Sequence, residues 1–173
     1  DTPVAGDVND ETSEDTALTV ALGVSDGDGN ALTCTTISGP DHGEVTFNAD
    51  CTKATYTPTP DWPAGNKDKT DTFKYQVCDP DNACATGTVT IKVHAVNDPP
   101  VGGDLNVETN EDTPKAIELP VSDADGDQLE VTITSGPDHG TMTVPVYSKT
   151  ITYTPGADWP KGHKDAIDAF TYK

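Results

Sequence analysis

The sequence predicts an all-β protein that consists of two tandem antiparallel Greek-key β-sandwiches. Short runs alternate apolar residues with Thr and are separated by Gly, Pro, Asp and Asn, which is the pattern of half-buried strands joined by tight turns. The chain also repeats itself. The segment SGPDHG stands at residues 38–43 and again, letter for letter, at 135–140. These two observations predict two sandwiches of one kind.

The repeat has a fixed offset of 97 positions and no gap. From Asp1 paired with Asp98 to Gln76 paired with Lys173, 39 of 76 aligned pairs are identical. This similarity indicates a tandem duplication. We therefore expect one domain at residues 1–97 and a second at 98–173, joined by Asn97, Asp98, Pro99 and Pro100. The prolines predict an extended, stiff linker.

In the first copy the strands are expected at residues 31–38, 43–47, 71–77 and 86–93. Residues 77–96 form the pattern of a closing β-hairpin. Lys173 corresponds to Gln76, so the second copy is expected to be truncated and to lack this hairpin. Two explanations stay open: an excerpt from a longer repeat array, or a missing strand supplied by another chain.

SGPDHG is interpreted as a turn between two strands, with Pro at a turn position and Gly at its exit. Asp41 and His42 are adjacent, so their side chains diverge in extended chain, and no nucleophile in a G-x-S-x-G context accompanies them. We expect no catalytic residues and no enzyme. Phe73 is expected to point inward and to alternate faces with Tyr75, and Trp62 to pack at a corner of the fold.

The charge distribution narrows the possible partners. The chain contains thirty acidic residues and ten basic ones, all of them Lys, so the formal net charge is −20. Nucleic acid is disfavoured, because phosphate recognition needs clustered cations. No apolar run approaches the roughly 20 residues that span a bilayer. A cation is the natural partner for this density of carboxylates.

The four cysteines indicate an oxidising compartment. Cys34 and Cys51 correspond to Val131 and Ser148 in the second copy, so both are lost together, which suggests that they pair. Cys78 and Cys84 flank a turn and would close the last hairpin. Three connectivities are possible, and a zinc site is a rival interpretation.

Several segments carry a resemblance to a known family: EDTP at 111–114, VSDADGD at 121–127, GPDHGTMT at 136–143, YTPGADWPKG at 153–162 and the stretch that runs from Asp71 into VNDPPV. They resemble the cadherin-like or Ig-like tandem repeats, of about 95 residues, found in large microbial surface and extracellular proteins. The resemblance covers nearly the whole chain. It implies a secreted or surface-displayed sandwich module that is often calcium-dependent and serves as a stalk or in adhesion.

The D-x-D pairs fit calcium, which prefers several hard oxygen ligands. They are not EF-hands, because Gln128 replaces the required Gly after Asp123, Asp125 and Asp127 and the flanks are strands. In cadherins calcium lies between consecutive domains. Carried over by position, the resemblance implies one ligand set at the junction and a second half-site that faces a domain upstream. The first set contains Glu14, Asp71, Asn97, Asp98, Asp123 and Asp125, and the half-site contains Asp26, Asp28, Asp79 and Asp81.

Three functions remain on the sequence alone. The first is a calcium-stiffened structural or adhesive segment of an extracellular repeat array, with neighbouring repeats as partners. The second is a subunit of an extracellular filament, assembled by strand or lateral contacts with other copies of the chain. The third is a carbohydrate-binding module that presents Trp62 or Trp159 to glycans.

Overall fold

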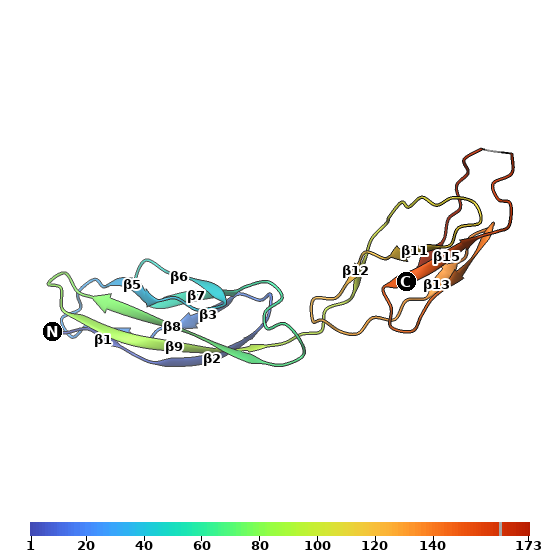
Figure 1. Cartoon of the computed structure of the whole chain (residues 1–173). Helices are drawn as coiled ribbons and strands as arrows, with labels where there is room; N and C mark the ends of the chain where they lie inside the picture. The colour runs from blue at the N-terminus through green and yellow to red at the C-terminus, as the bar shows by residue number, and fades with distance from the viewer. Residues whose placement is uncertain (163) are drawn as a thin grey trace. The chain divides into compact units, whose positions relative to one another are not determined.

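A computed structural model describes residues 1–162 and 164–173 and divides the chain into two units, Asp1–Asn97 and Asp98–Lys173 (Figure 1). The described residues contain strands, turns and irregular connections and no helix. The all-β expectation is confirmed. Each unit is described by itself below.

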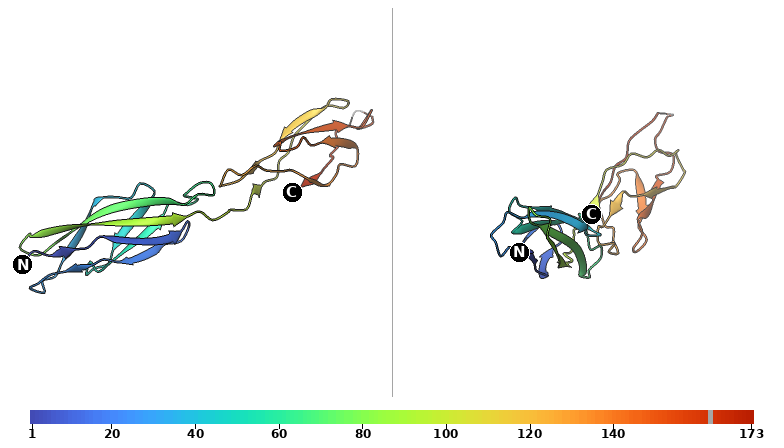
Figure 2. Two further views of the ribbon diagram at one scale, coloured as in Figure 1. Left: turned by 90° about the horizontal axis from the view of Figure 1, so that it is seen from below. Right: turned by 90° about the vertical axis from the view of Figure 1, so that its left-hand side faces the viewer.

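The first unit contains nine strands, which follow the predicted alternation closely. Figure 2 shows them in blue to green, running side by side along the unit. Their bounds are β1 Val4–Ala5, β2 Val8–Ser13, β3 Leu18–Ala21, β4 Val24–Ser25, β5 Thr33–Ser38, β6 Gly43–Phe47, β7 Lys53–Pro58, β8 Lys69–Cys78 and β9 Cys84–His94.

Two sheets form the sandwich of the first unit. One has the order β2-β9-β8-β5 and the other β3-β7-β6, while β1 and β4 pair separately. All pairs are antiparallel except β2 with β9, which run parallel from Val8 beside Val89 to Ser13 beside His94. The expectation of a wholly antiparallel sandwich is therefore corrected at this edge, where a strand from the start of the unit lies beside its last strand.

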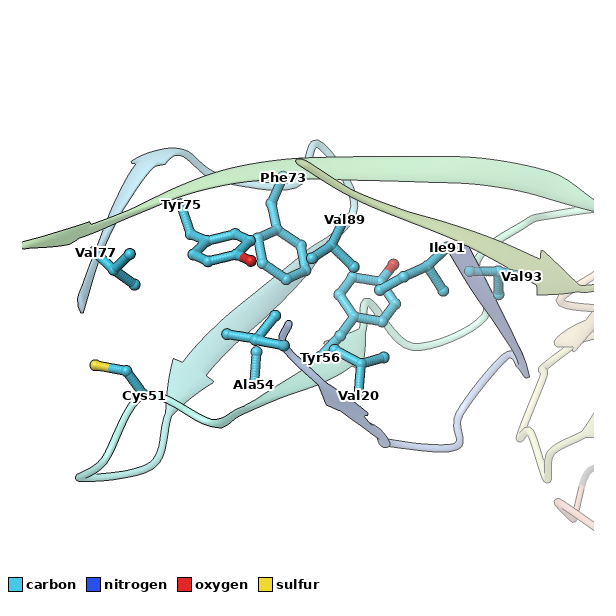
Figure 3. Packing of buried hydrophobic residues seen from close by; sticks show 11 residues of the cluster. Val20, Cys51, Ala54, Tyr56, Phe73, Tyr75, Val77, Val89, Ile91 and Val93 are labelled. Carbon is cyan, nitrogen blue, oxygen red and sulfur yellow. The ribbon is translucent and has the colours of Figure 1, made fainter. Parts of the chain in front are cut away.

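Apolar residues from both sheets meet in the core of the first unit, as Figure 3 shows. Phe73, Tyr75 and Val77 of β8 face the same interior as Ala54 and Tyr56 of β7, and none of the five is more than 1% exposed. The remaining buried members of this cluster are Val20, Leu22, Cys51, Val89, Ile91 and Val93. Tyr75 does not point outward as predicted. Residues two apart on a strand share a face, so it is buried with Phe73.

The described residues of the second unit form seven strands. They are β10 Val101–Gly102, β11 Lys115–Glu118, β12 Val121–Ser122, β13 Ile133–Ser135, β14 Gly140–Thr143, β15 Thr150–Pro155 and β16 Thr171–Tyr172. The sheet β11-β15-β14 corresponds to β3-β7-β6 of the first unit, and β13-β16 corresponds to β5-β8. The smaller core contains Ile117, Leu119, Val131, Ile151 and Tyr153. No strand is assigned at residues 105–110, the counterpart of β2.

Candidate functional site

The SGPDHG turn of the first unit is built on the carboxylate of Asp71, which is 3% exposed on β8. The backbone N–H groups of Asp41 and His42 each donate to one of its oxygens at 2.9 Å. The Tyr56 hydroxyl donates to the second oxygen at 3.0 Å, and Thr72 N–H donates to the first at 2.9 Å. Charged acceptors make strong hydrogen bonds, so one carboxylate fixes the whole turn.

The last Gly of the motif is required by close approach. A Cβ at Gly43 would lie 2.5 Å from the Tyr56 ring and 2.7 Å from the carbonyl oxygen of Thr57. At Gly140 the same positions, Tyr153 and Thr154, would be 2.4 and 2.7 Å away. The repeated motif therefore encodes a turn with no room for a side chain at its exit.

The second unit repeats this arrangement with Asp168. It accepts from the N–H groups of Asp138 at 2.8 Å and His139 at 3.0 Å and from the Tyr153 hydroxyl at 2.9 Å. Burial of Tyr153, its hydrogen bond to Asp168 and the charge of that group together raise the pKa of the phenol to about 12. Burial acts to raise the pKa of Asp168, but the hydrogen bonds, led by that from Tyr153, hold it below its ordinary value of 3.8.

His42 of the SGPDHG turn stacks on Trp62, which follows β7, with ring centroids 4.4 Å apart and planes 14° from parallel. His139 and Trp159 stack in the same way at 4.7 Å and 9°. Each Trp precedes a cis proline, Pro63 or Pro160. Trp62 is half-buried and packs against the core cluster. One indole face is thus covered by an imidazole, which fits corner packing better than an open sugar platform.

The sequence placed Asp71 among the calcium ligands, but in the structure this residue lies beneath the SGPDHG turn. Its two oxygens accept four hydrogen bonds beneath the SGPDHG turn. The aligned Asp168 does the same in the second unit. We therefore assign both residues to the turn. The resemblance to cadherins assigned Asp71 to calcium by its sequence position before Phe73. Sequence position alone does not show which hydrogen-bond donors surround a carboxylate.

The D-x-D loop of the second unit brings three carboxylates together. Asp123, Asp125 and Asp127 each offer an oxygen within 4.8 Å of the others. The backbone N–H of Asp98 donates to Oδ2 of Asp125 at 2.7 Å, and that of Asp127 donates to Oδ1 of Asp123 at 3.0 Å. Asp123 and Asp125 are half-buried. The carboxylates of Asp123 and Asp125 therefore lie in one cluster, and the backbone of Asp98 contacts it.

The first unit has the matching loop at Asp26 and Asp28. Oδ1 of Asp26 accepts from the N–H groups of Asp28 at 3.0 Å and Asn30 at 3.1 Å. Among the described residues, its Oδ2 is buried and has no hydrogen-bond partner. The amino group of Asp1 contacts Asp28, as the N–H of Asp98 contacts Asp125. A buried carboxylate oxygen facing no donor is the kind of atom that a cation stabilises.

Asp79 belongs to the same end of the first unit. The hydrogen bond to Asp28 raises the pKa of the Asp1 amino group; burial acts against this, and the charges of Asp28, Asp26 and Asp79 raise the pKa further. Asp79 is 6% exposed and accepts from Ala83 N–H at 2.8 Å. Asp81, the fourth predicted residue of this half-site, is exposed in the following turn.

Glu14 marks the other end of the first unit. It is 4% exposed, accepts from the N–H of Val96 and donates its own N–H to the His94 carbonyl at 3.0 Å. Its carboxylate therefore lies beside the segment that leads to Asn97, which is exposed.

Asp68, immediately before β8, bonds to β9 and to the segment that leads to Asn97. It accepts from Lys92 at 2.9 Å, from a ring nitrogen of His94 at 3.0 Å and from Ala95 N–H at 3.2 Å. The hydrogen bonds from Lys92 and then His94 lower its pKa to about 2.

Sequence reasoning missed several acids that take part in these clusters. Asp127 was considered only in rejecting an EF-hand, although its alternation with Asp123 and Asp125 could have identified it. No sequence pattern pointed to Asp68, because its side-chain hydrogen-bond donors come from the distant strand β9. Asp15 accepts from Asp61 N–H at 3.1 Å, and Asp112 accepts from Asp158 N–H at the same distance. Because both copies of the repeat have an Asp at these two positions, a comparison of the copies could have identified the contact.

Both disulfides are formed as predicted, Cys34 with Cys51 and Cys78 with Cys84. The described residues include no free cysteine, so the zinc interpretation is not supported. In the second unit Val131 stands where Cys34 does and is 8% exposed. An apolar contact there replaces a covalent one.

The fold and these clusters define a pair of Ig-like β-sandwiches with acidic loops. The sequence matches the family described as "Bacterial Ig domain" twice, over residues 1–92 and 97–173, and the chain therefore belongs to that family. The expected class of cadherin-like or Ig-like tandem repeats is confirmed. No curated protein matches the sequence significantly.

Solved structures with a similar fold include an endo-fucoidan hydrolase, MfFcnA4, of glycoside hydrolase family 107. It is 21% identical, with 99% of this chain and 26% of that one covered and a TM-score of 0.48. The protocadherin GammaB4 extracellular domain is 13% identical, with 99% and 34% covered and a TM-score of 0.45. The chain thus spans about a quarter and a third of these two structures.

None of the described residues forms a helix that is long and apolar enough to cross a membrane.

Proposed function

We propose that this chain is a structural segment of an extracellular repeat array, the stalk of a surface adhesin, whose acidic loops bind calcium. The observation that carries the proposal is the D-x-D loop, which gathers the carboxylates of Asp123, Asp125 and Asp127 in the second unit and, in the first, leaves Oδ2 of Asp26 buried without a partner among the described residues. Like charges held this close repel one another unless a cation neutralises them.

The donor set fits calcium. Carboxylate oxygens are hard ligands, and calcium accepts six to eight of them in flexible geometry, together with carbonyl and water oxygens. Asp123, Asp125 and Asp127 would supply the protein ligands in the second unit. In the first unit Asp26, Asp28 and Asp79 would supply them. A bound calcium ion provides two positive charges that offset the repulsion within each cluster.

The proposal assigns calcium a mechanical effect as well. Residues 97–100 contain Asp98 and two prolines, and the N–H of Asp98 already bonds to the D-x-D loop of the second unit. A cation that fixes this loop would also fix the start of the second unit. The linker would then have fewer conformations, as a stalk requires.

Extracellular location is part of the same proposal. Two disulfides persist only where thiols are not kept reduced, and millimolar calcium is an extracellular condition. Membership of the bacterial Ig domain family supports this assignment.

The test is thermal unfolding of the whole chain, freed of metal by chelation and then given 1 mM calcium. A dissociation constant of about 10⁻⁴ M would stabilise each unit by about 1.4 kcal/mol, or roughly 5 to 10 °C. Variants that retain either Trp62 or Trp159 report each unit separately by fluorescence.

The variant that removes the second site is Asp123→Asn with Asp125→Asn, which keeps the side-chain volumes. Its matched control is Glu118→Gln, an exposed acid on β11. The second unit should lose its calcium response in the double variant and keep it in the control. An equal response in both, or none in the parent chain, would refute calcium binding. Small-angle scattering with calcium and with chelator tests the linker, and unchanged dimensions would remove the mechanical effect alone.

A further inference from the structure

The two disulfides of the first unit have different surroundings. Cys51 is 1% exposed and belongs to the buried cluster in Figure 3, and Cys34 packs against that cluster (Figure 3). Cys78 and Cys84 do not occur among the described residues that form or line it. Cys84 is exposed at the start of β9, and Cys78 is half-buried at the end of β8. A dissolved molecule therefore reaches a sulfur of the second disulfide more easily than one of the first.

The Cys78–Cys84 disulfide closes the turn between β8 and β9. Its two residues are directly opposite each other, with Cα atoms 4.2 Å apart. Asp79 begins the turn. Its N–H donates to the Ala83 carbonyl at 3.0 Å, its carbonyl accepts from Asn82 N–H at 3.2 Å, and its Oδ1 accepts from Ala83 N–H at 2.8 Å. Asp79, which is 6% exposed, is thus held both by the disulfide and by the bonds of the turn.

The pairing of the two strands continues far beyond this disulfide. β8 and β9 form ten antiparallel pairs, from Lys69 opposite Val93 to Cys78 opposite Cys84. Val77, the neighbour of Cys78, is 0% exposed in the core. The end of a hairpin opens at a lower free energy than the buried part of its strands. Loss of this bond is therefore expected to loosen the turn while the sandwich stays folded.

We propose that Cys78–Cys84 is a thiol-exchange site. A small thiol reduces this disulfide in the folded chain, while Cys34–Cys51 stays intact, and reduction releases Asp79 from its fixed position. This part of the proposal needs no metal. One consequence rests on the proposed function: because Asp79 is among the calcium ligands proposed for the first unit, the oxidised chain should bind calcium there more tightly than the reduced chain.

The exchange consumes two small thiols for each disulfide. A thiolate attacks Sγ of the exposed Cys84 and forms a mixed disulfide with it, and Cys78 leaves as a thiolate. A second thiolate attacks the small-molecule sulfur of the mixed disulfide, so that Cys84 leaves in turn. The two small thiols depart joined as an oxidised disulfide, and the two protons that they gave up end on Cys78 and Cys84.

The charge around the site selects the thiol. Asp79 follows Cys78 directly, Asp81 is exposed in the same turn, and the chain has a net charge of −20. These carboxylates repel an anionic thiol. Relative to their rates with an uncharged model disulfide, we expect cationic cysteamine to react fastest, neutral 2-mercaptoethanol next and anionic mercaptoacetate slowest. Added salt should reduce the differences.

The test is timed reduction of the folded chain by 2-mercaptoethanol in chelator, followed by alkylation of free thiols and mass mapping of peptides. Cys78 and Cys84 should be alkylated about tenfold faster than Cys34 and Cys51 or more, with an unchanged circular dichroism spectrum. The mixed disulfide trapped early should be on Cys84. Equal rates for the two disulfides, or reduction only as the first unit unfolds, would overturn the proposal. A mixed disulfide on Cys78 would show that the assigned direction of attack is wrong.

A matched pair of variants tests the selection by charge. Asp81→Asn removes one carboxylate beside the site and should raise the rate with mercaptoacetate about twofold at low salt. Glu44→Gln removes an exposed acid on β6 and should leave that rate unchanged. Equal rates in the two variants would contradict a local effect of charge.

Release of Asp79 is measured with Cys78→Ser and Cys84→Ser combined, which removes the disulfide permanently. Amide hydrogen exchange at Asn82 and Ala83 should be about tenfold faster than in the parent chain, whereas exchange at Ile91 within β9 should not change. Unchanged exchange at Ala83 would show that the turn alone holds Asp79, and the release would be refuted.

The consequence for calcium is measured by thermal unfolding of the same double variant. Its first unit should need about tenfold more calcium than the parent for half of the full stabilisation, and the second unit should respond as before. An equal calcium requirement in both chains would refute the consequence. If the parent itself does not respond to calcium, the proposed function fails, while the reduction and hydrogen-exchange results still decide the thiol-exchange site.

Discussion

The two units place corresponding aromatic residues in different environments. Phe73 and Tyr75 are 1% and 0% exposed, whereas their counterparts Phe170 and Tyr172 are only half-buried. The neighbouring residues are similar in both copies, so local sequence does not account for the difference. What differs is β9, which covers β8 along ten paired residues in the first unit. Burial of a strand residue is thus determined by the strand beside it.

The SGPDHG turns show the opposite behaviour. Asp71 and Asp168 accept the same backbone bonds, Tyr56 and Tyr153 donate the same hydroxyl bond, and each His stacks on its Trp. This arrangement forms in both units, although the described residues of the second include no counterpart of β9. The turn is therefore specified by the residues it contains and by one carboxylate on the following strand.

The largest effect is expected from truncating the aligned Phe residues, Phe73 and Phe170, whose burial differs between the units. Phe73→Ala should destabilise the first unit by about 4 kcal/mol, because it leaves a cavity in a closed core. Phe170→Ala should cost the second unit about 1 to 2 kcal/mol, since this side chain is already partly exposed. Chemical denaturation followed by Trp62 or Trp159 fluorescence measures the two values. Equal losses would show that Phe170 is buried in solution as fully as Phe73.

The next largest effect is expected from removing the Cys34–Cys51 disulfide, which the second unit replaces with Val131 and Ser148. Cys34→Val with Cys51→Ser gives the first unit the residues that the second has at these positions. The lost cross-link should cost the first unit about 3 kcal/mol, because the unfolded chain gains loop entropy. The second unit should unfold as before. A variant as stable as the parent would mean that the introduced valine packs as well as Val131 does and replaces the bond.

The smallest effect is a pH dependence of the second unit. Its Asp168 has a folded-state pKa below the ordinary 3.8, so ionisation of this group favours folding. This stabilisation is complete above that value and is lost as the pH falls below 3.8 through the lower folded-state pKa. Thermal unfolding of the second unit between pH 5 and pH 2 should therefore show a decline that is weaker in Asp168→Asn. Identical acid profiles for the parent and the variant would exclude this role.

Much of the fold followed from the sequence because its signals are local or repeated. Alternation of Thr with apolar residues predicted β5, β6, β8 and β9, and the 97-residue offset predicted like folds. The paired loss of Cys34 and Cys51 predicted their disulfide. Each of these conclusions needs only neighbours in sequence or a comparison of the two copies.

The candidate site was less predictable, because the surroundings of a carboxylate come from distant segments. Asp71 was taken for a metal ligand, but the turn at residues 41–42 and Tyr56 surround it. The contacts of Asp68 were visible only in the structure, where β9 places Lys92 and His94 beside it. The parallel pairing of β2 with β9 was missed for the same reason, since strand order is a long-range property.

By itself, the sequence determined an acidic, disulfide-bonded tandem of sandwiches and the turns within each copy, because these depend on short-range pattern, composition and duplication. Only the tertiary structure decided which carboxylates are satisfied by protein donors and which gather in the D-x-D loops. It also decided that Asp71 and Asp168 lie beneath the SGPDHG turns. The physical reason is that burial and hydrogen bonding of a side chain depend on the strands that fold next to it, whatever their distance along the chain.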